Sequence, residues 1–185
     1  MAGQDSATYL AASTDTRNKM IMKDIKLDIL HYPILRWRWR AHVLPSGGDE
    51  RESETNDSAA GIYVVFRVQN LLWKKVPTII KYTWSTSAPV GTQTSRGFDR
   101  FTVRVEESGE ENLGEWVTEE VDLVEHYRSI FGHDPNRRTV GIGLFTDQDN
   151  TRSSAAADYD DIVIMTRPAA QSFRDTHSPP CAPYP

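Results

Sequence analysis

The clearest pattern in the chain is a strict alternation of apolar and basic residues within the segment 29–43. A period of two is that of a β-strand, because successive side chains point to opposite faces of a sheet. The sequence therefore predicts a strand whose tryptophan-bearing face belongs to the core and whose arginine-bearing face contacts water. The alternating residues are Leu35, Arg36, Trp37, Arg38, Trp39 and Arg40.

Further segments have the alternation or the β-branched and aromatic composition of strands, and turn residues separate them. The segment 60–68 is almost entirely apolar, which is typical of a strand that is covered on both faces. The remaining strand-like segments contain fewer apolar residues and alternate more clearly. The predicted strands after the first are 60–68, 79–85, 101–106, 114–121, 139–146 and 160–166.

One short α-helix is expected at about residues 122–131. Asp122 is placed to cap its N-terminus, and Glu125 follows three residues later, which is capping-box spacing with Asp in place of Ser or Thr. Gly132 is suited to end the helix. The apolar residues of this segment fall on one stripe, made of Val124, Tyr127, Ile130 and Phe131.

This order of elements predicts an all-β fold. About seven or eight short strands with a single helix, and no alternation of strands with helices, favour an antiparallel two-sheet β-sandwich. Jelly rolls have this plan. We expect one domain over residues 1–167. Residues 168–185 are rich in Pro, Ser and Ala, which predicts a disordered C-terminal tail.

Composition and charge narrow the classes of partner. The hydrophobic fraction is 38% and the charged fraction 25%, as in ordinary globular domains. The net charge of −5 gives no general attraction to a phosphate backbone, so nucleic acid is not expected as a partner. No apolar run reaches the roughly 18 residues of a membrane span. We therefore expect a soluble domain.

Cysteine usage and the N-terminus bear on the compartment without deciding it. Cys181 is the only cysteine, so an intrachain disulfide cannot form. This fits a reducing compartment, although many exported proteins also lack disulfides. Residues 1–17 are polar and lack the apolar stretch of a secretory signal peptide. The sequence therefore leaves the localisation open.

The arginine row is the first candidate ligand site. Guanidinium groups bind carboxylates and sulfates through paired hydrogen bonds and stack on aromatic rings, so a concave arginine and aromatic face would suit an anionic ligand or a glycan. The alternative is an exposed sheet face on which the arginines pair with acidic residues of neighbouring strands. The candidate ligand-binding residues are Arg36, Arg38, Arg40, Tyr82 and Trp84.

A second candidate site follows the predicted strand 139–146, where carboxylate and amide oxygens occur close together. Calcium binds six to eight such oxygens, so a structural calcium ion is one interpretation. The spacing does not match an EF-hand loop. The other interpretation is a turn whose side chains hydrogen-bond to their own backbone. The candidate calcium ligands are Asp147, Asp149, Asn150 and Asp161.

An acidic loop and the absence of catalytic motifs bear on enzyme activity. The loop 45–58 is long and polar, and its carboxylates supply a hydrolase pair only if the fold holds two of them across one bond. We expect them to be solvated instead. Histidines in zinc-type spacing, a Gly-x-Ser-x-Gly elbow and a phosphate-binding loop are all absent. The loop carboxylates are Asp49, Glu50, Glu52, Glu54 and Asp57.

Four stretches of the chain, in order and covering roughly residues 8–166, resemble the bacterial family known as domain of unknown function 3047. The resemblance implies a β-sandwich like that of carbohydrate-binding modules and an exported or envelope setting, but it supplies no function. The four stretches are Pro33–Arg40, Asn56–Phe66, Tyr82–Ser85, and Thr146–Thr151 followed by Tyr159–Ile162.

Two departures from the family pattern affect these expectations. The family usually has a leader and an additional strand before Tyr9, which this chain nearly lacks, and export is therefore in doubt. The family usually has a glycine where this chain has Asp160, before Asp161, and this alters the expected oxygen site.

The sequence thus favours a non-catalytic binding or accessory module for a glycan or another anionic or polar ligand. The alternative is a structural subunit that docks on a larger protein assembly through an apolar sheet face. A hydrolase with dispersed carboxylates is the third interpretation. No cofactor is required by any of these patterns, apart from the structural calcium ion considered above.

Overall fold

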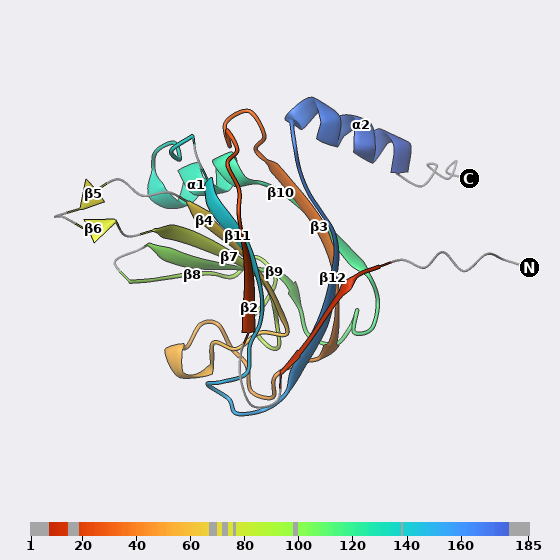
Figure 1. The fold of residues 1–185 in the computed structure, drawn as a ribbon. Coiled ribbons are helices and arrows are strands. Elements are labelled where there is room, and N and C mark those ends of the chain that lie inside the picture. Colours follow the sequence, from red (N-terminus) through yellow and green to blue (C-terminus); the bar gives the residue numbers. More distant parts are fainter. Residues whose placement is uncertain are drawn as a thin grey trace, which may run out of the picture.

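The computed structural model describes residues 8–14, 19–66, 70–71, 74–75, 77–97, 100–137 and 139–177. Two β-sheets pack face to face (Figure 1), and strands account for 48% of the chain, so the predicted all-β sandwich is confirmed. The small sheet has the order β1-β12-β3-β10, and the large sheet has the order β2-β11-β4-β7-β9-β8.

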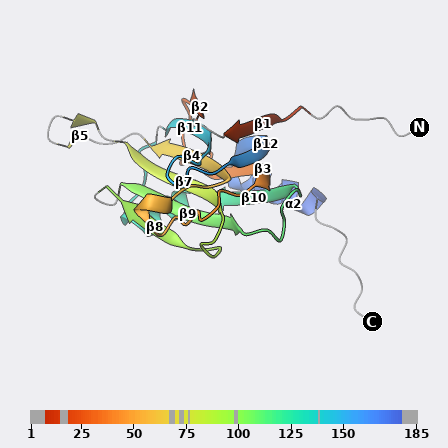
Figure 2. The same cartoon turned by 90° about the horizontal axis from the view of Figure 1, so that it is seen from below.

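The small sheet contains β1 (Leu10–Thr14), β3 (Ile34–Val43), β10 (Val117–Asp122) and β12 (Ala155–Met165). The large sheet contains β2 (Lys19–Asp24), β4 (Ala60–Phe66), β7 (Thr78–Ser85), β8 (Gln93–Arg96), β9 (Phe101–Ser108) and β11 (Thr139–Thr146). A separate pair of two-residue strands, β5 (Asn70–Leu71) and β6 (Lys74–Lys75), extends from the end of β4 (Figure 2).

The core forms where the apolar face of β3 meets the apolar face of β7. Trp37 and Trp39 are fully buried, as the alternation predicted. The ring of Trp37 lies 5.6 Å from that of Tyr82, and the ring of Trp39 lies 6.2 Å from that of Trp84. Four large aromatic side chains from two sheets therefore interlock at the centre of the sandwich.

One pairing in the large sheet differs from the predicted antiparallel arrangement. Strand β9 runs parallel to β7, while β8 runs antiparallel to β9 at the sheet edge. The chain leaves β7, skips one strand position to form β8, and then returns to fill the vacant position as β9. Because β9 and β7 are both antiparallel to β8, they must run parallel to each other.

The predicted helix is present as α1 (Leu123–Phe131). The side chain of Asp122 accepts hydrogen bonds from the backbone N–H groups of Val124 and Glu125, both at 3.0 Å. Gly132 ends the helix with a φ of 75°, in the left-handed region that glycine adopts without steric cost. The sequence thus located both ends of this helix.

The prediction of a disordered tail from residue 168 is wrong for its first part, where the chain forms α2 (Arg167–His177) beside the small sheet (Figure 1). Thr166 caps this helix, since its hydroxyl accepts a hydrogen bond from the Ala169 N–H at 3.3 Å. A proline is tolerated in the first turn of a helix, so Pro168 does not prevent it. Residues 178–185 lie outside the described residues.

Three strands of the sandwich were not predicted, namely β1, β2 and β8, and β12 begins at Ala155 rather than at residue 160. These segments are short or polar and carry little alternation. Their partners hold them in place, because β1 pairs with β12, β2 with β11, and β8 with β9. Among the described residues, neither helix is long and apolar enough to cross a membrane.

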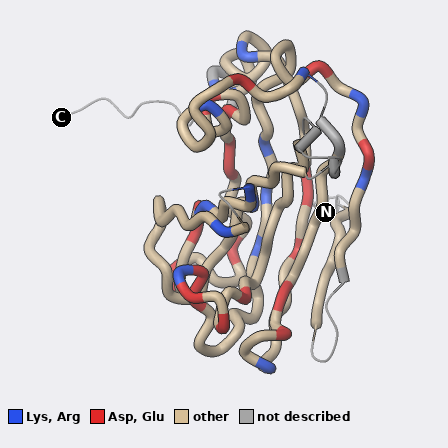
Figure 3. Tube along the Cα trace, turned by 90° about the vertical axis from the view of Figure 1, so that its left-hand side faces the viewer, with Lys and Arg blue, Asp and Glu red and all other residues tan. Residues whose placement is uncertain are grey.

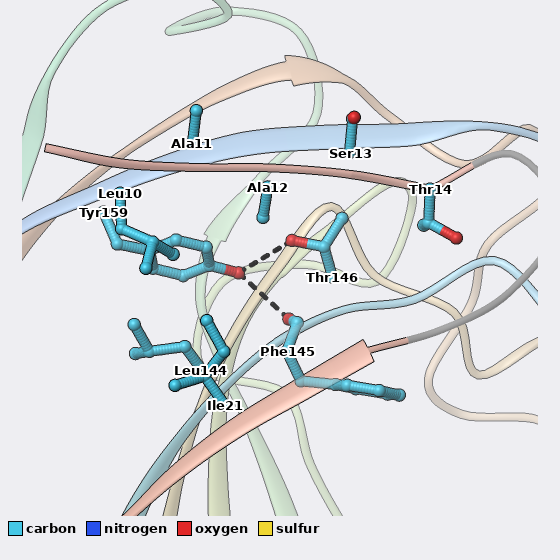
Figure 4. Close-up of a pocket in the computed structure, with 10 residues that line it drawn as sticks. All are labelled: Leu10, Ala11, Ala12, Ser13, Thr14, Ile21, Leu144, Phe145, Thr146 and Tyr159. Carbon is cyan, nitrogen blue, oxygen red and sulfur yellow. Dashed lines mark hydrogen bonds between the residues drawn. The ribbon is translucent and has the colours of Figure 1, made fainter.

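Tyr159 links the two sheets through its hydroxyl group (Figure 4). The side chain comes from β12, and its Oη donates to the carbonyl of Phe145 on β11 at 3.0 Å. The same oxygen lies 3.0 Å from Thr146 Oγ1 and accepts a hydrogen bond from the backbone N–H of Gly61 on β4 at 3.2 Å. This side chain also lines a cavity of about 260 Å³ beside β1.

We expect Tyr159→Phe to lower the free energy of unfolding by about 1–3 kcal/mol, because the Gly61 N–H and the Phe145 carbonyl lose their hydrogen bonds to the tyrosine hydroxyl. Chemical denaturation followed by tryptophan fluorescence measures this change. Tyr9→Phe, at a tyrosine that is 45% exposed, is the control and should change the stability little. Equal effects in the two variants would contradict a special role for the Tyr159 hydroxyl.

Candidate functional site

The arginine row lies on the outer face of the small sheet, where each arginine has an acidic residue directly opposite on a neighbouring strand. Arg36 pairs with Glu120 of β10 at 3.4 Å. Arg38 and Arg40 pair with Asp160 and Asp158 of β12, at 2.7 Å and 2.6 Å. The expected cross-strand ion pairs are therefore present.

The ion pairs with Arg38 and Arg40 favour the charged forms of Asp160 and Asp158. Although burial acts in the opposite direction, hydrogen bonds from His42 and Arg40 lower the pKa of Asp158. The hydrogen bond from Arg38 lowers the pKa of Asp160. The three ion pairs balance the arginine face with its own carboxylates. Basic and acidic positions are also interspersed along the rest of the described chain (Figure 3).

Aromatic side chains cover the arginines from the solvent side. The guanidinium groups of Arg38 and Arg40 each lie 4.7 Å from the ring of Trp116. Tyr9 packs edge-on against the same indole. Arg36 lies 4.2 Å from the ring of Phe173 on α2. Aromatic groups do accompany the arginines, but they come from loops and α2 rather than from β7.

A cavity of about 360 Å³ opens on this face between α2, β3, β10 and β12. Its volume lies within the range of small-molecule sites. Polar and apolar groups share its wall, as is usual for sites that orient a ligand through a few hydrogen bonds. The lining residues are Arg36, Trp37, Arg38, Thr118, Asp161, Val163, Met165 and Phe173.

Asp161 stands out at the rim of this cavity. Its φ of 49° is in the left-handed region, which costs free energy for a residue other than glycine. The strand pairing of β12 with β3 is irregular between Asp160 and Val163, so Asp161 belongs to a bulge. Its carboxylate lies 3.1 Å from Arg38 Nε without the alignment of a hydrogen bond, and its side chain is 66% exposed. Bulges of this kind often turn a side chain toward a site.

The structure separates Tyr82 and Trp84 from the arginines with which the sequence analysis grouped them. Both are fully buried between the sheets. Alternation places the arginines on the opposite side of β3 from Trp37 and Trp39, and only that tryptophan side faces β7. The two predicted aromatic ligand residues are therefore core residues.

The predicted oxygen-rich turn is present after β11, and a third carboxylate joins it. Ligand atoms of Asp57, Asp147 and Asp149 lie within 4.8 Å of one another, so the cluster can hold a metal ion. Asp161 is not part of this cluster, because it pairs with Arg38 on the small sheet. The sequence analysis missed Asp57 as a ligand, since it assigned that residue to a solvated loop.

Asp57 also holds the turn in place. Its carboxylate accepts hydrogen bonds from the backbone N–H groups of Asn150, at 3.2 Å, and Thr151, at 2.6 Å. The Thr151 hydroxyl donates to it as well. The turn interpretation expected side chains of the turn itself to bond to its backbone, whereas the carboxylate that holds Asn150 and Thr151 comes from a distant part of the chain.

The loop 45–58 is not solvated as a whole. Glu50 and Asp57 are fully buried, because the loop folds back over the outer face of the large sheet. Ser85 and Thr83 donate hydrogen bonds to the Glu50 carboxyl group. Burial raises the pKa of this group, and the nearby ammonium group of Lys81 partly offsets the rise. The expectation of a solvated acidic loop is wrong for these two residues.

Lys81 occupies the centre of this polar layer, with only 1% of its surface exposed. It lies on the outer face of β7, close to the ring of Tyr63. Burial, together with Asp57 and Asp149, raises the pKa of Asp147 to about 6, while Lys81 acts to lower it. No motif in the sequence signals this lysine, because its position on β7 would face water if the loop 45–58 did not cover it.

Comparison with known proteins identifies the family but no activity. None of the curated proteins matches the chain. The family model described as "Protein of unknown function (DUF3047)" matches residues 1–163, which include every strand up to the bulge of β12 and exclude α2. The chain therefore belongs to this family, as the four sequence stretches indicated.

Proposed function

We propose that this domain is a non-catalytic binding module for an acidic glycan, in the manner of jelly-roll carbohydrate-binding modules. The supporting observation is the cavity on the arginine face, which combines two arginines with apolar walls. A uronate or sulfate group would bind Arg36 and Arg38, and the sugar ring would contact Phe173 and Met165.

The state of Arg38 supports this proposal. Its Nε has no aligned hydrogen-bond partner among the described residues, and the carboxylate nearest to it belongs to the strained and exposed Asp161. A ligand carboxylate can take the place of Asp161 at little cost, because an exposed ion pair contributes roughly 0–1 kcal/mol. The ligand then gains the paired hydrogen bonds that Asp161 does not make.

The docking alternative also has one supporting observation. A groove of about 500 Å³ lies where β2 and β11 approach β12, and its wall is largely apolar. Met20, Ile21 and Met22 of the edge strand β2 are more than 40% exposed. Because the exposed wall of this groove is largely apolar, whereas the arginine cavity presents two guanidinium groups that would select an anionic ligand, we rank ligand binding first.

We expect Arg38→Ala to weaken the binding of uronic acid oligosaccharides by about 10-fold to 100-fold, because a charge-assisted hydrogen bond contributes about 1.5–3 kcal/mol. Isothermal titration calorimetry with galacturonate and mannuronate trisaccharides measures this loss. Arg38→Lys should recover only part of the affinity, since an ammonium group cannot make the paired hydrogen bonds.

Arg137→Ala is the matched control, because this arginine is exposed and pairs with Asp28 away from the cavity. It should bind the trisaccharides as the unchanged protein does. If the unchanged protein binds no acidic trisaccharide, or if Arg137→Ala and Arg38→Ala weaken binding equally, the arginine cavity is not the site.

We further propose that Asp57, Asp147 and Asp149 bind a structural calcium ion. Three carboxylates meet there, and the buried hydroxyl of Ser58 has no hydrogen-bond partner among the described residues. Ser58 is next to Asp57, and its carbonyl accepts a hydrogen bond from the Asp147 N–H. The ammonium group of Lys81 already offsets part of the negative charge of these carboxylates. We therefore expect weak calcium binding, with a dissociation constant on the order of 10⁻⁴–10⁻³ M.

Calcium should raise the thermal midpoint of unfolding by mass action, and more so well above pH 6 than well below it. The pKa of Asp147 is about 6, so protons displace calcium from this carboxyl group as the pH falls through that value. Asp147→Asn should abolish the calcium effect, whereas Asp28→Asn should retain it. A midpoint that calcium leaves unchanged at every pH would overturn this assignment.

A further inference from the structure

The sandwich is open along part of the edge at which β1 and β2 lie (Figure 2). Strand β1 closes one part of this edge, because it pairs with β12 from Ala155 to Tyr159. Beyond Tyr159, the described residues place no further strand on that side of β12. The apolar groove of about 500 Å³ lies at this opening, and its volume is within the range of small-molecule sites.

The walls of the groove come from the inner faces of both sheets. Ile142 and Leu144 of β11 and Ile164 of β12 belong to the hydrophobic core or pack against it. Ile21 lies opposite Leu144 in the strand register, so it shares this inward face. Ile21 and Ile162 also line the groove and remain 54% and 37% exposed. The groove is therefore an extension of the core that is open to solvent, rather than a patch on the outer surface.

The apolar walls continue beneath β1. The cavity of about 260 Å³ beside β1 shares Ile21 and Leu144 with the groove, so the two spaces adjoin at these side chains (Figure 4). Leu10, Ala12 and Tyr159 line the inner space. Apolar surface thus extends along the edge of the sandwich from β12 to β1. This arrangement suits a linear hydrocarbon chain, because each buried methylene group adds to the binding free energy.

Two lysines stand at the rim of the groove. Lys23 lies opposite Ile142, on the inward face of β2, and Lys26 follows the end of that strand. Both are exposed, and neither forms an ion pair within the part of the chain that the structure describes. Asp24 is the one acidic residue that lines the groove, and it lies on the other face of β2, opposite Gly141. The rim therefore carries a net positive charge.

We propose that this groove binds an anionic amphiphile, namely a long-chain fatty acid. The hydrocarbon chain lies between the sheets against Ile21, Leu144 and Ile164, and the carboxylate pairs with Lys23 or Lys26 at the rim. Lysine suits this position because its aliphatic stem covers apolar surface while its ammonium group stays in water. The proposal goes beyond the acidic-glycan function and does not depend on the arginine cavity, which lies on the outer face of the small sheet.

Other occupants fit the groove less well. A folded protein cannot enter a space between two sheets, and a lysine on an edge strand, as Lys23 is on β2, discourages the addition of a further strand. A glycan would lose hydrogen bonds to water that the apolar walls do not replace. A cationic amphiphile would be repelled by the lysines at the rim.

The experiment is isothermal titration calorimetry of the full chain with laurate below its micelle concentration, and with octanoate and dodecyltrimethylammonium for comparison. We expect laurate to bind at least about tenfold more tightly than octanoate, because four further methylene groups leave water. Dodecyltrimethylammonium has the same chain length and the opposite charge, so it should bind more weakly than laurate.

Ile21→Glu tests the wall of the groove. It places a carboxylate among apolar side chains and should weaken laurate binding at least about tenfold. Ile21 is largely exposed on an edge strand, so the variant should fold, which its tryptophan fluorescence checks. Val90→Glu is the matched control, because Val90 is 60% exposed and precedes β8 at the other edge of the large sheet. It should bind laurate as the unchanged protein does.

The double variant Lys23→Gln with Lys26→Gln tests the rim. It should weaken laurate binding about threefold to tenfold, as expected for the loss of exposed ion pairs. It should not weaken the binding of dodecyltrimethylammonium, whereas damage to the fold would weaken the binding of both ligands. Arg51→Gln, at an exposed arginine that pairs with Asp49 on the loop 45–58, is the control for a lost positive charge and should leave laurate binding unchanged.

The assignment is overturned if the unchanged protein does not bind laurate, or binds laurate no more tightly than octanoate. Equal losses of affinity in Ile21→Glu and Val90→Glu, or in the double lysine variant and Arg51→Gln, would place the site elsewhere and overturn it as well. Binding to phosphatidylglycerol vesicles without binding of monomeric laurate would also contradict the proposal, and would indicate a membrane surface as the partner.

Discussion

The contact between the tryptophans of β3 and the aromatic residues of β7 determines much of the remaining structure. Trp37 and Trp39 interlock with Tyr82 and Trp84, and this fixes which face of each sheet points inward. Aromatic pairs of this kind contribute about 0.5–1.5 kcal/mol beyond the area that they bury. Because alternation is strict, the same contact forces Arg36, Arg38 and Arg40 to the outer face of the small sheet, where the acidic residues of β10 and β12 neutralise them.

Charged residues are partly or fully buried in three places in the sandwich, and their surroundings differ from place to place. On the arginine face, directly opposed carboxylates pair with the guanidinium groups. Under the loop 45–58, the buried Lys81 is surrounded by Glu50 and Asp147, so unlike charges offset one another. At the β9–β10 edge, burial, followed by the charges of Glu106 and Glu107, raises the pKa of Glu119 to about 8.

Part of the candidate site was predictable because its signal is local. The arginine row lies within one short segment of the sequence, and the Asp147–Asn150 turn lies within another. Each is found where the alternation or the turn residues indicated. The residues that join these two sites from distant parts of the chain were not predictable. Asp57 joins Asp147 across some 90 residues of chain, and Phe173 reaches the cavity from a helix that the composition of the tail concealed. The apolar stripe and the cap identified α1, whereas α2 carries no comparable signal before its packing against β3 is known.

The sequence by itself determined the fold class, the faces of β3 and the position of α1, because period-two alternation and capping act between residues close along the chain. Only the tertiary structure decided that Tyr82 and Trp84 belong to the core, that Glu50, Asp57 and Lys81 are buried, and that β9 turns its charges inward. These outcomes depend on which strand lies opposite another and on where the long loop folds back. Such contacts are set by the packing of distant segments, for which a single sequence carries no periodic pattern.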